Sequence, residues 1–171
     1  GLRPGSASMH FGSLDSLIIR LLREETTVWL ERLESVAQEG RRTLSPRDLA
    51  GLLTTTPQQS PLFCRLVAAL PAIADRSTIE MDRILDLETR RLRQFRKTGA
   101  IIESLCPSLK TGDGVIVLRR AVLLAGALEP LVNPPSCLLL AMDDKALSPL
   151  YPDAVEELRT LLEAVLSAMC D

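Results

Sequence analysis

The chain has 171 residues, of which 46% are hydrophobic, 25% are charged and only 3% are aromatic. This length and composition predict a globular protein with one sizeable core of Leu, Ala, Val and Ile, a bias that favours helices. The formal net charge of −2 argues against a protein that binds nucleic acid through most of its surface, because such proteins are basic.

The cysteines and the apolar runs predict a cytoplasmic protein. Cys64, Cys106, Cys137 and Cys170 lie far apart and form no C-x-x-C pair, so we expect no metal, no cofactor and no disulfide framework. No signal peptide is visible, and the longest apolar run, residues 121–128, is shorter than the roughly 18–20 residues that a membrane span needs. We therefore expect no membrane partner.

The first seventeen residues predict a short helix joined to a long one. A tight turn leads into a short helix that carries residues 9–11 and stops at Gly12. Ser13 then begins a long helix as its N-cap, because its side-chain oxygen can accept hydrogen bonds from unpaired amides of the first turn. We expect this long helix to continue to about Glu39, with a polar interruption at 24–27 between two apolar stripes.

Six further helices are predicted along the rest of the chain. Residues 45–48 form a capping box with proline at the first helical position, and the helix that they begin ends in 54–57. Pro71 is expected to end or kink its helix and Pro130 to close another, because the proline ring clashes with the preceding turn. The other five helices are expected at 60–71, 77–106, 115–128, 136–142 and from 151 onward. The predicted fold class is therefore all-α, with about seven or eight helices and no strand.

The last two long helices predict a homodimer. The segment 115–128 is apolar nearly all round, and the helix from 151 has an apolar face wider than one neighbouring helix would cover. Such a surface can continue across a two-fold axis as a four-helix bundle with two helices from each subunit. The alternative is that both helices only complete the monomer's core. The residues expected at the interface are Val122, Leu158, Leu162, Val165, Leu166 and Met169.

The sequence resembles the TetR family of transcriptional regulators. Residues 1–17 are similar to the end of that family's helix-turn-helix, with Ser8 in place of the usual Tyr and Leu14 in place of the usual Lys. The matching residues are Gly1, Leu2, Gly5, Ser6, Ala7, His10, Phe11, Gly12, Ser13 and Leu17. A weaker similarity to the family's effector-binding domain continues through 60–65, 129–135 and 153–158.

The resemblance implies two domains and a regulatory function. Residues 1–17 would be the remnant of a DNA-binding head, in which Ser6, Met9 and His10 face operator DNA, and residues 18–171 would bind ligand and dimerise. The two helices that hold the recognition helix in place are not in this sequence, so we expect operator binding only with a complete head. The polar stretch 24–27 would then mark the passage from head to core, or simply a solvated turn.

The resemblance further implies a repressor that releases DNA when a small apolar effector fills its helical core. Two polar residues, Glu88 and Arg119, are candidates for orienting that ligand, with an internal ion pair or a dimer contact as the alternative. The apolar candidates are the large side chains on inward faces, each of which is equally a candidate for ordinary core. They are Trp29, Leu33, Phe63, Val67, Met81, Ile84 and Leu124.

Two other functional classes compete with a regulator. An enzyme is not expected, because the sequence has no Gly-rich phosphate loop, no metal-ligand spacing and only one histidine to serve a catalytic set. The stronger alternative is a helical small-molecule carrier or adaptor that does not bind DNA. A natural gene that begins near Gly1, with no upstream head, would favour this alternative.

Overall fold

The computed structural model describes residues 14–40, 43–58, 60–76 and 81–170. These residues form seven α-helices and one short 3₁₀ helix, and they contain no strand, which confirms the predicted all-α class. The helices are α2 (Leu14–Gly40), α3 (Pro46–Gln58), α4 (Pro61–Arg76), α5 (Met81–Leu105), α6 (Asp113–Val132), α7 (Ser136–Met142), η1 (Ser148–Leu150) and α8 (Ala154–Cys170).

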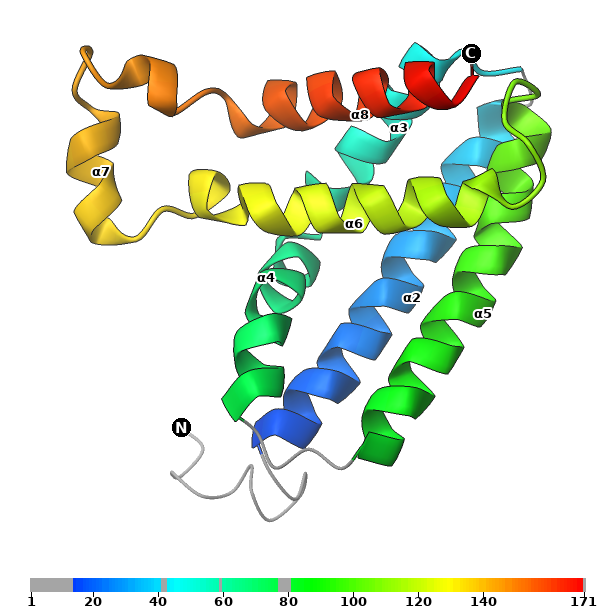
Figure 1. Cartoon of the computed structure of the whole chain (residues 1–171), viewed down its shortest axis with the longest axis horizontal. Helices are drawn as coiled ribbons and strands as arrows, with labels where there is room; N and C mark the ends of the chain where they lie inside the picture. Colours follow the sequence, from blue (N-terminus) through cyan, green and yellow to red (C-terminus); the bar gives the residue numbers. More distant parts are fainter. Residues whose placement is uncertain (1–13, 41–42, 59, 77–80, 171) are drawn as a thin grey trace.

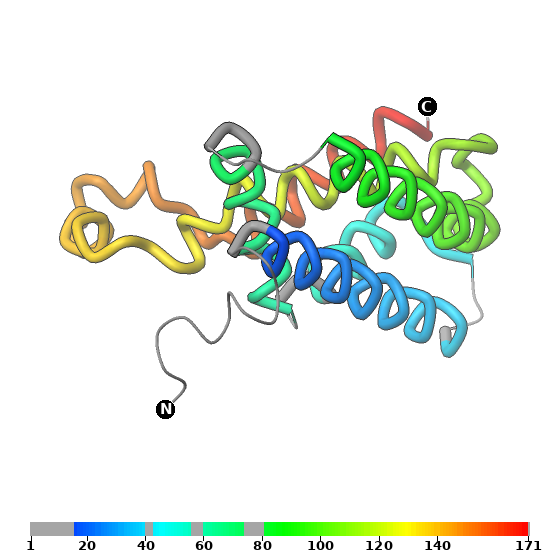
Figure 2. The backbone as a smooth tube through the Cα atoms, turned by 90° about the horizontal axis from the view of Figure 1, so that it is seen from below, coloured from blue at the N-terminus to red at the C-terminus, as the bar shows by residue number. Residues whose placement is uncertain are grey.

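The helices form two groups that cross each other. The long helices α2 and α5 run side by side, with α4 beside them, while α6 and α8 form a second, antiparallel pair that lies across this group (Figure 1). Helix α3 joins the two groups because it packs mainly against α8 and also contacts α2. Beyond one end of the α6–α8 pair, α7 and η1 project away from the other helices (Figures 1 and 2).

A capping signal in the sequence correctly predicted the start of α3, whereas the last helix, expected from 151 onward, begins at Ala154 behind a cap formed by Asp153. At the start of α3, the Asp48 amide donates to Ser45 Oγ at 3.1 Å, and the Ser45 amide donates to Asp48 Oδ2 at 3.1 Å. At the start of α8, Asp153 Oδ1 accepts hydrogen bonds from the amides of Val155 and Glu156. Both caps satisfy amides that have no partner inside the helix.

The predicted helix ends were less accurate. Pro130 was expected to close its helix, but α6 continues to Val132, and α3 continues beyond 54–57 to Gln58. Pro71 likewise lies inside α4. A proline in the last turn removes only one backbone hydrogen bond, and the Asn133 amide closes α6 by donating to the Glu129 carbonyl at 2.9 Å.

An aromatic cluster joins α2, α4 and α5 in the core. The Trp29 ring stacks on Phe63 of α4 with centroids 5.1 Å apart, and it meets the Phe95 ring of α5 edge-on at 6.3 Å. All three side chains are buried, and the Trp29 indole N–H has no hydrogen-bond partner. The cluster therefore holds α2 through apolar burial and ring contacts alone.

A polar contact on the rim of the same interface also ties α2 to α5. Glu34 Oε2 accepts a hydrogen bond from Lys97 Nζ at 2.7 Å, and its Oε1 accepts one from Thr98 Oγ1 at 2.6 Å. Burial alone would raise the pKa of Glu34, but these two hydrogen bonds and the Lys97 charge outweigh it and lower the pKa. The carboxylate thus stays ionised and bonded to α5 at neutral pH.

Helices α5 and α6 cross with their backbones in contact. A Cβ on Gly114 would lie 2.3 Å from the carbonyl oxygen of Gly99, so neither helix has room for a side chain at this point. One carboxylate oxygen of Glu103 on α5 accepts hydrogen bonds from the amides of Gly112 and Gly114 at 2.9 and 2.8 Å. Helix α5 therefore both positions α6 and caps its N-terminus.

Candidate functional site

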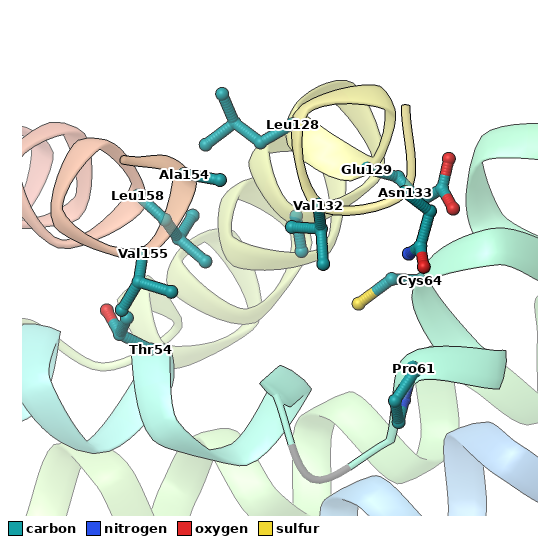
Figure 3. Close-up of a pocket in the computed structure, with 11 residues that line it drawn as sticks. Thr54, Pro61, Cys64, Leu128, Glu129, Val132, Asn133, Ala154, Val155 and Leu158 are labelled. Atoms are coloured by element: carbon teal, nitrogen blue, oxygen red, sulfur yellow. The ribbon is translucent and has the colours of Figure 1, made fainter. Parts of the chain in front are cut away.

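An apolar cavity lies between the two helix groups, where α3 and α4 meet the C-terminal end of α6 and the start of α8 (Figure 3). Its volume is about 130 Å³, and the hollow measures about 590 Å³ when the space that opens to solvent is counted. The smaller volume is close to that of an engineered apolar cavity that binds benzene. The lining residues are Thr54, Pro61, Cys64, Ala125, Leu128, Glu129, Val132, Asn133, Ala154, Val155 and Leu158.

Two polar side chains of the cavity gather on one side, while the hydroxyl of Thr54, on the other side, donates a hydrogen bond to the Ala50 carbonyl at 2.8 Å (Figure 3). Glu129 and Asn133 lie next to Cys64, whereas Val155 and Leu158 line the opposite side (Figure 3). Asn133 directly follows the last residue of α6, and its side chain lies next to that of Glu129 in the last helical turn (Figure 3). The cavity therefore has an apolar part and one polar end, an arrangement typical of sites that orient an amphipathic ligand.

An arginine on α4 holds this polar end together. Arg65 Nη2 donates a hydrogen bond to Asn133 Oδ1 at 2.5 Å, and Arg65 Nε lies 3.4 Å from Glu129 Oε1. The Glu129 side chain is only 14% exposed, whereas the arginine lies mostly in solvent. These contacts tie α4 to the end of α6 across the cavity mouth.

The Cys64 thiol faces this cavity in its protonated form. Burial and, to a smaller extent, the charge of the nearby Glu129 raise the pKa of Cys64 to about 11. A thiol in this environment is a weak nucleophile at neutral pH, because the thiolate is the reactive form. The site is therefore suited to reversible binding rather than to covalent chemistry.

Comparison with known proteins places this fold in a family. A family model described as tetracyclin repressor-like, C-terminal domain, matches residues 23–169. The chain belongs to the TetR family. A comparison with curated proteins found no match. The match covers every element that lines the cavity, so the cavity lies within the TetR-like C-terminal domain.

None of the nine residues named as ligand-site candidates lines the cavity of this TetR-family domain. Trp29, Leu33 and Phe63 are fully buried in the core. Val67 and Leu124 are half-buried and pack against that core. Met81 is 70% exposed at the start of α5, away from any interior surface.

Ile84 is half-buried on α5. The two polar candidates, Glu88 and Arg119, lie together outside the apolar cavity. Glu88 and Arg119 line one open hollow between α5 and α6, where Glu88 is paired with Arg91. The hollow is separate from the apolar cavity. The structure thus brings these two charged residues together, but away from Cys64 and Glu129.

The residues predicted at the dimer interface mostly pack inside the TetR-family subunit. Val122, Leu158, Leu162 and Leu166 are buried within it, whereas Val165 and Met169 are half-buried.

The predicted DNA contacts Ser6, Met9 and His10 lie outside the described residues. Among the described residues, no helix combines the length and apolar character that crossing a bilayer requires.

Sequence reasoning missed the polar end of the cavity. Glu129 and Asn133 were noted as part of the segment 129–135 that resembles the family's effector-binding domain, but not as ligand-site candidates. One signal was available: Glu129 is the only acidic residue between Gly114 and Val132, a stretch that is otherwise largely apolar. A charge in such a segment must find a partner or a cavity, because burying it alone is costly.

Proposed function

We propose that this chain is the sensor and dimerisation part of a transcriptional regulator, a repressor that releases operator DNA when a small, largely apolar molecule occupies the cavity. The observation that carries the proposal is the cavity itself, about 130 Å³ in volume and lined mainly by apolar side chains. Membership of the TetR family supports a regulator in general.

Helix α4 links the cavity to α2. Cys64 lines the cavity, while its neighbour Phe63 stacks on Trp29 of α2. Arg32 of α2 also donates a hydrogen bond at 2.8 Å to the hydroxyl of Ser60, directly before α4. A ligand that shifts α4 must therefore change how α4 packs on α2.

Helix α2 begins at Leu14, within the segment 1–17 that resembles the end of a helix-turn-helix. A change in the position of α2 would therefore also move a DNA-binding domain attached to its N-terminal end. If α4 can pack on α2 in two arrangements, a ligand that binds one arrangement more tightly than the second shifts the population toward it and so changes the affinity for DNA.

A cavity-filling substitution tests this coupling without a known ligand. We expect Cys64→Phe, in the protein expressed from its natural gene, to weaken binding to its own promoter DNA by about tenfold or more, because the added ring imitates an occupied cavity. Mobility-shift titration measures this change. The matched control is Ala69→Phe, an exposed position on the same helix, and it should bind DNA as the unmodified protein does. Equal DNA affinity for both variants would contradict the proposal.

We further propose that the subunits pair through the outer faces of α6 and α8. On α6, Leu123 is 60% exposed although it lies in the middle of the helix. On α8, the exposed residues Thr160, Ala164 and Ala168 are small and recur every four residues, so they form one face that another helix can approach closely. The opposite faces of both helices are already covered inside the subunit.

The arm, residues 133–153, continues this outer surface. No side chain of the arm is buried, and Leu140 of α7 is 79% exposed. Leu139, Leu147 and Leu150 are also exposed. The arm extends from the ends of α6 and α8 (Figure 2), so a second copy that covers these helices is also well placed to cover its leucines. Uncovered apolar surface of this kind usually marks an interface.

Dimerisation is tested by placing a charge on the proposed face. The unmodified chain should give a native mass near twice 18.7 kDa, and Leu123→Glu should give a monomer at micromolar concentration, because it would bury an unpaired carboxylate. Leu85→Glu is the control, since Leu85 is similarly exposed on α5 and should leave the dimer intact. A monomeric unmodified chain, or a dimeric Leu123→Glu variant, would rule out this interface.

A further inference from the structure

We propose that the ligand of the cavity is a lipophilic amine, whose apolar body contacts Val155 and Leu158 and whose ammonium group binds the carboxylate of Glu129. This inference rests on the proposed ligand-binding function and names the chemical class of the ligand. The cavity would accordingly prefer a cation to a neutral molecule of the same shape, and would reject an anion.

The charge of the cavity lining supports a cationic ligand. Glu129 is the only charged residue among the eleven described residues that line the cavity. Its ionic partner among the described residues is Arg65, whose Nε lies 3.4 Å from Oε1, and Arg65 itself does not line the cavity. The carboxylate therefore retains acceptor capacity that an ammonium group can use.

The amide of Asn133 adds a second polar contact of defined orientation. Its Oδ1 accepts the hydrogen bond from Arg65, so the amide nitrogen, a donor, is the group left for a ligand. The polar end thus offers an anionic acceptor and a neutral donor one helical turn apart. Among the residues that the structure describes, no cationic side chain lines the cavity to receive a ligand carboxylate.

The surroundings strengthen this preference. A carboxylate that is mostly buried beside apolar side chains acts through a lower dielectric than water, so its attraction for an ammonium group is larger than at the surface. The Glu129 charge also affects Cys64, because burial and this charge both raise the pKa of the Cys64 thiol. A ligand carboxylate in this position would meet the same repulsion.

Three compounds with one hydrocarbon cage and different polar groups test the proposal on the whole chain: adamantylamine, adamantanol and adamantane carboxylate. By isothermal titration calorimetry, we expect the amine to bind about tenfold or more tighter than the alcohol, and the carboxylate to bind weakest. Glu129→Gln should abolish the preference for the amine while leaving the affinity for the alcohol within about twofold.

Two further variants distinguish a lost preference for the amine from a loss of folding. Glu88→Gln, in the hollow between α5 and α6, should keep the full preference for the amine. Arg65→Gln should raise the amine affinity several-fold, because it removes the positive charge nearest to Glu129 at a solvent-exposed position. An amine that binds no better than the alcohol, no amine binding at all, or a preference that survives Glu129→Gln would overturn the proposed ligand class. The Cys64→Phe measurement of DNA affinity tests the regulatory function independently of these outcomes.

Discussion

Trp29→Ala is expected to lower the free energy of unfolding by about 3–5 kcal/mol, the usual cost of removing a large buried aromatic side chain. Trp29 is fully buried, and its ring contacts both Phe63 and Phe95. Its removal therefore leaves a cavity at the meeting point of α2, α4 and α5. Urea unfolding followed by far-UV circular dichroism measures the change, since Trp29 is the only tryptophan and the variant loses its fluorescence signal.

The matched variant Trp29→Phe isolates the role of the ring from that of the indole N–H. Because this N–H has no hydrogen-bond partner, its loss should cost nothing, and only the smaller ring should matter, at about 1–2 kcal/mol. Met81→Ala serves as the exposed control and should change the stability by less than about 0.5 kcal/mol. Equal losses for Trp29→Ala and Met81→Ala would show that the aromatic cluster does not hold α2 in place.

Gly114→Ala is expected to lower the free energy of unfolding by about 1–3 kcal/mol, through overpacking rather than through a cavity. The new Cβ would lie 2.3 Å from the oxygen and 2.6 Å from the carbonyl carbon of Gly99. These are backbone atoms, so neither can rotate away, and α6 must move off α5. The displacement also strains the hydrogen bond from the Gly114 amide to Glu103.

Gly51→Ala provides a control with the opposite sign. Gly51 lies within α3, and a Cβ there would meet no atom within 4 Å. Alanine should therefore raise the stability by about 1 kcal/mol, as it does in an unhindered helix interior. Thermal or urea unfolding of the two variants gives the comparison. A neutral or stabilising Gly114→Ala would contradict the close backbone contact between α5 and α6.

Some features of this protein follow from short stretches of sequence. The start of α3 was predictable from Ser45 with Asp48, because a helix cap involves residues only two or three positions apart. The all-α class was also predictable, because the helix propensity of Leu and Ala and the helical spacing of apolar residues are both properties of short stretches of sequence. The resemblance to the TetR family was also visible in the sequence, and the family match bears it out.

The location of the cavity depended on the tertiary structure. Trp29 and Phe63 were candidates for pocket walls, yet they stack on each other and fill the space between α2 and α4. The cavity forms instead beside the next residue along α4, Cys64, where the end of α6 and the start of α8 leave a gap. Helical periodicity shows which residues share a face, but it does not show whether the facing side chains meet or leave a space.

Helical periodicity was likewise insufficient to predict what covers the wide apolar face of α8. Leu158, Leu162 and Leu166 were expected to meet a second subunit, but α3 and α6 of the same subunit cover α8 from two sides. The sequence by itself determined the helices, the start of α3, the fold class and the family. Only the tertiary structure decided which apolar faces are already covered and where Glu129 meets an empty space, because those outcomes depend on contacts between residues far apart in the chain.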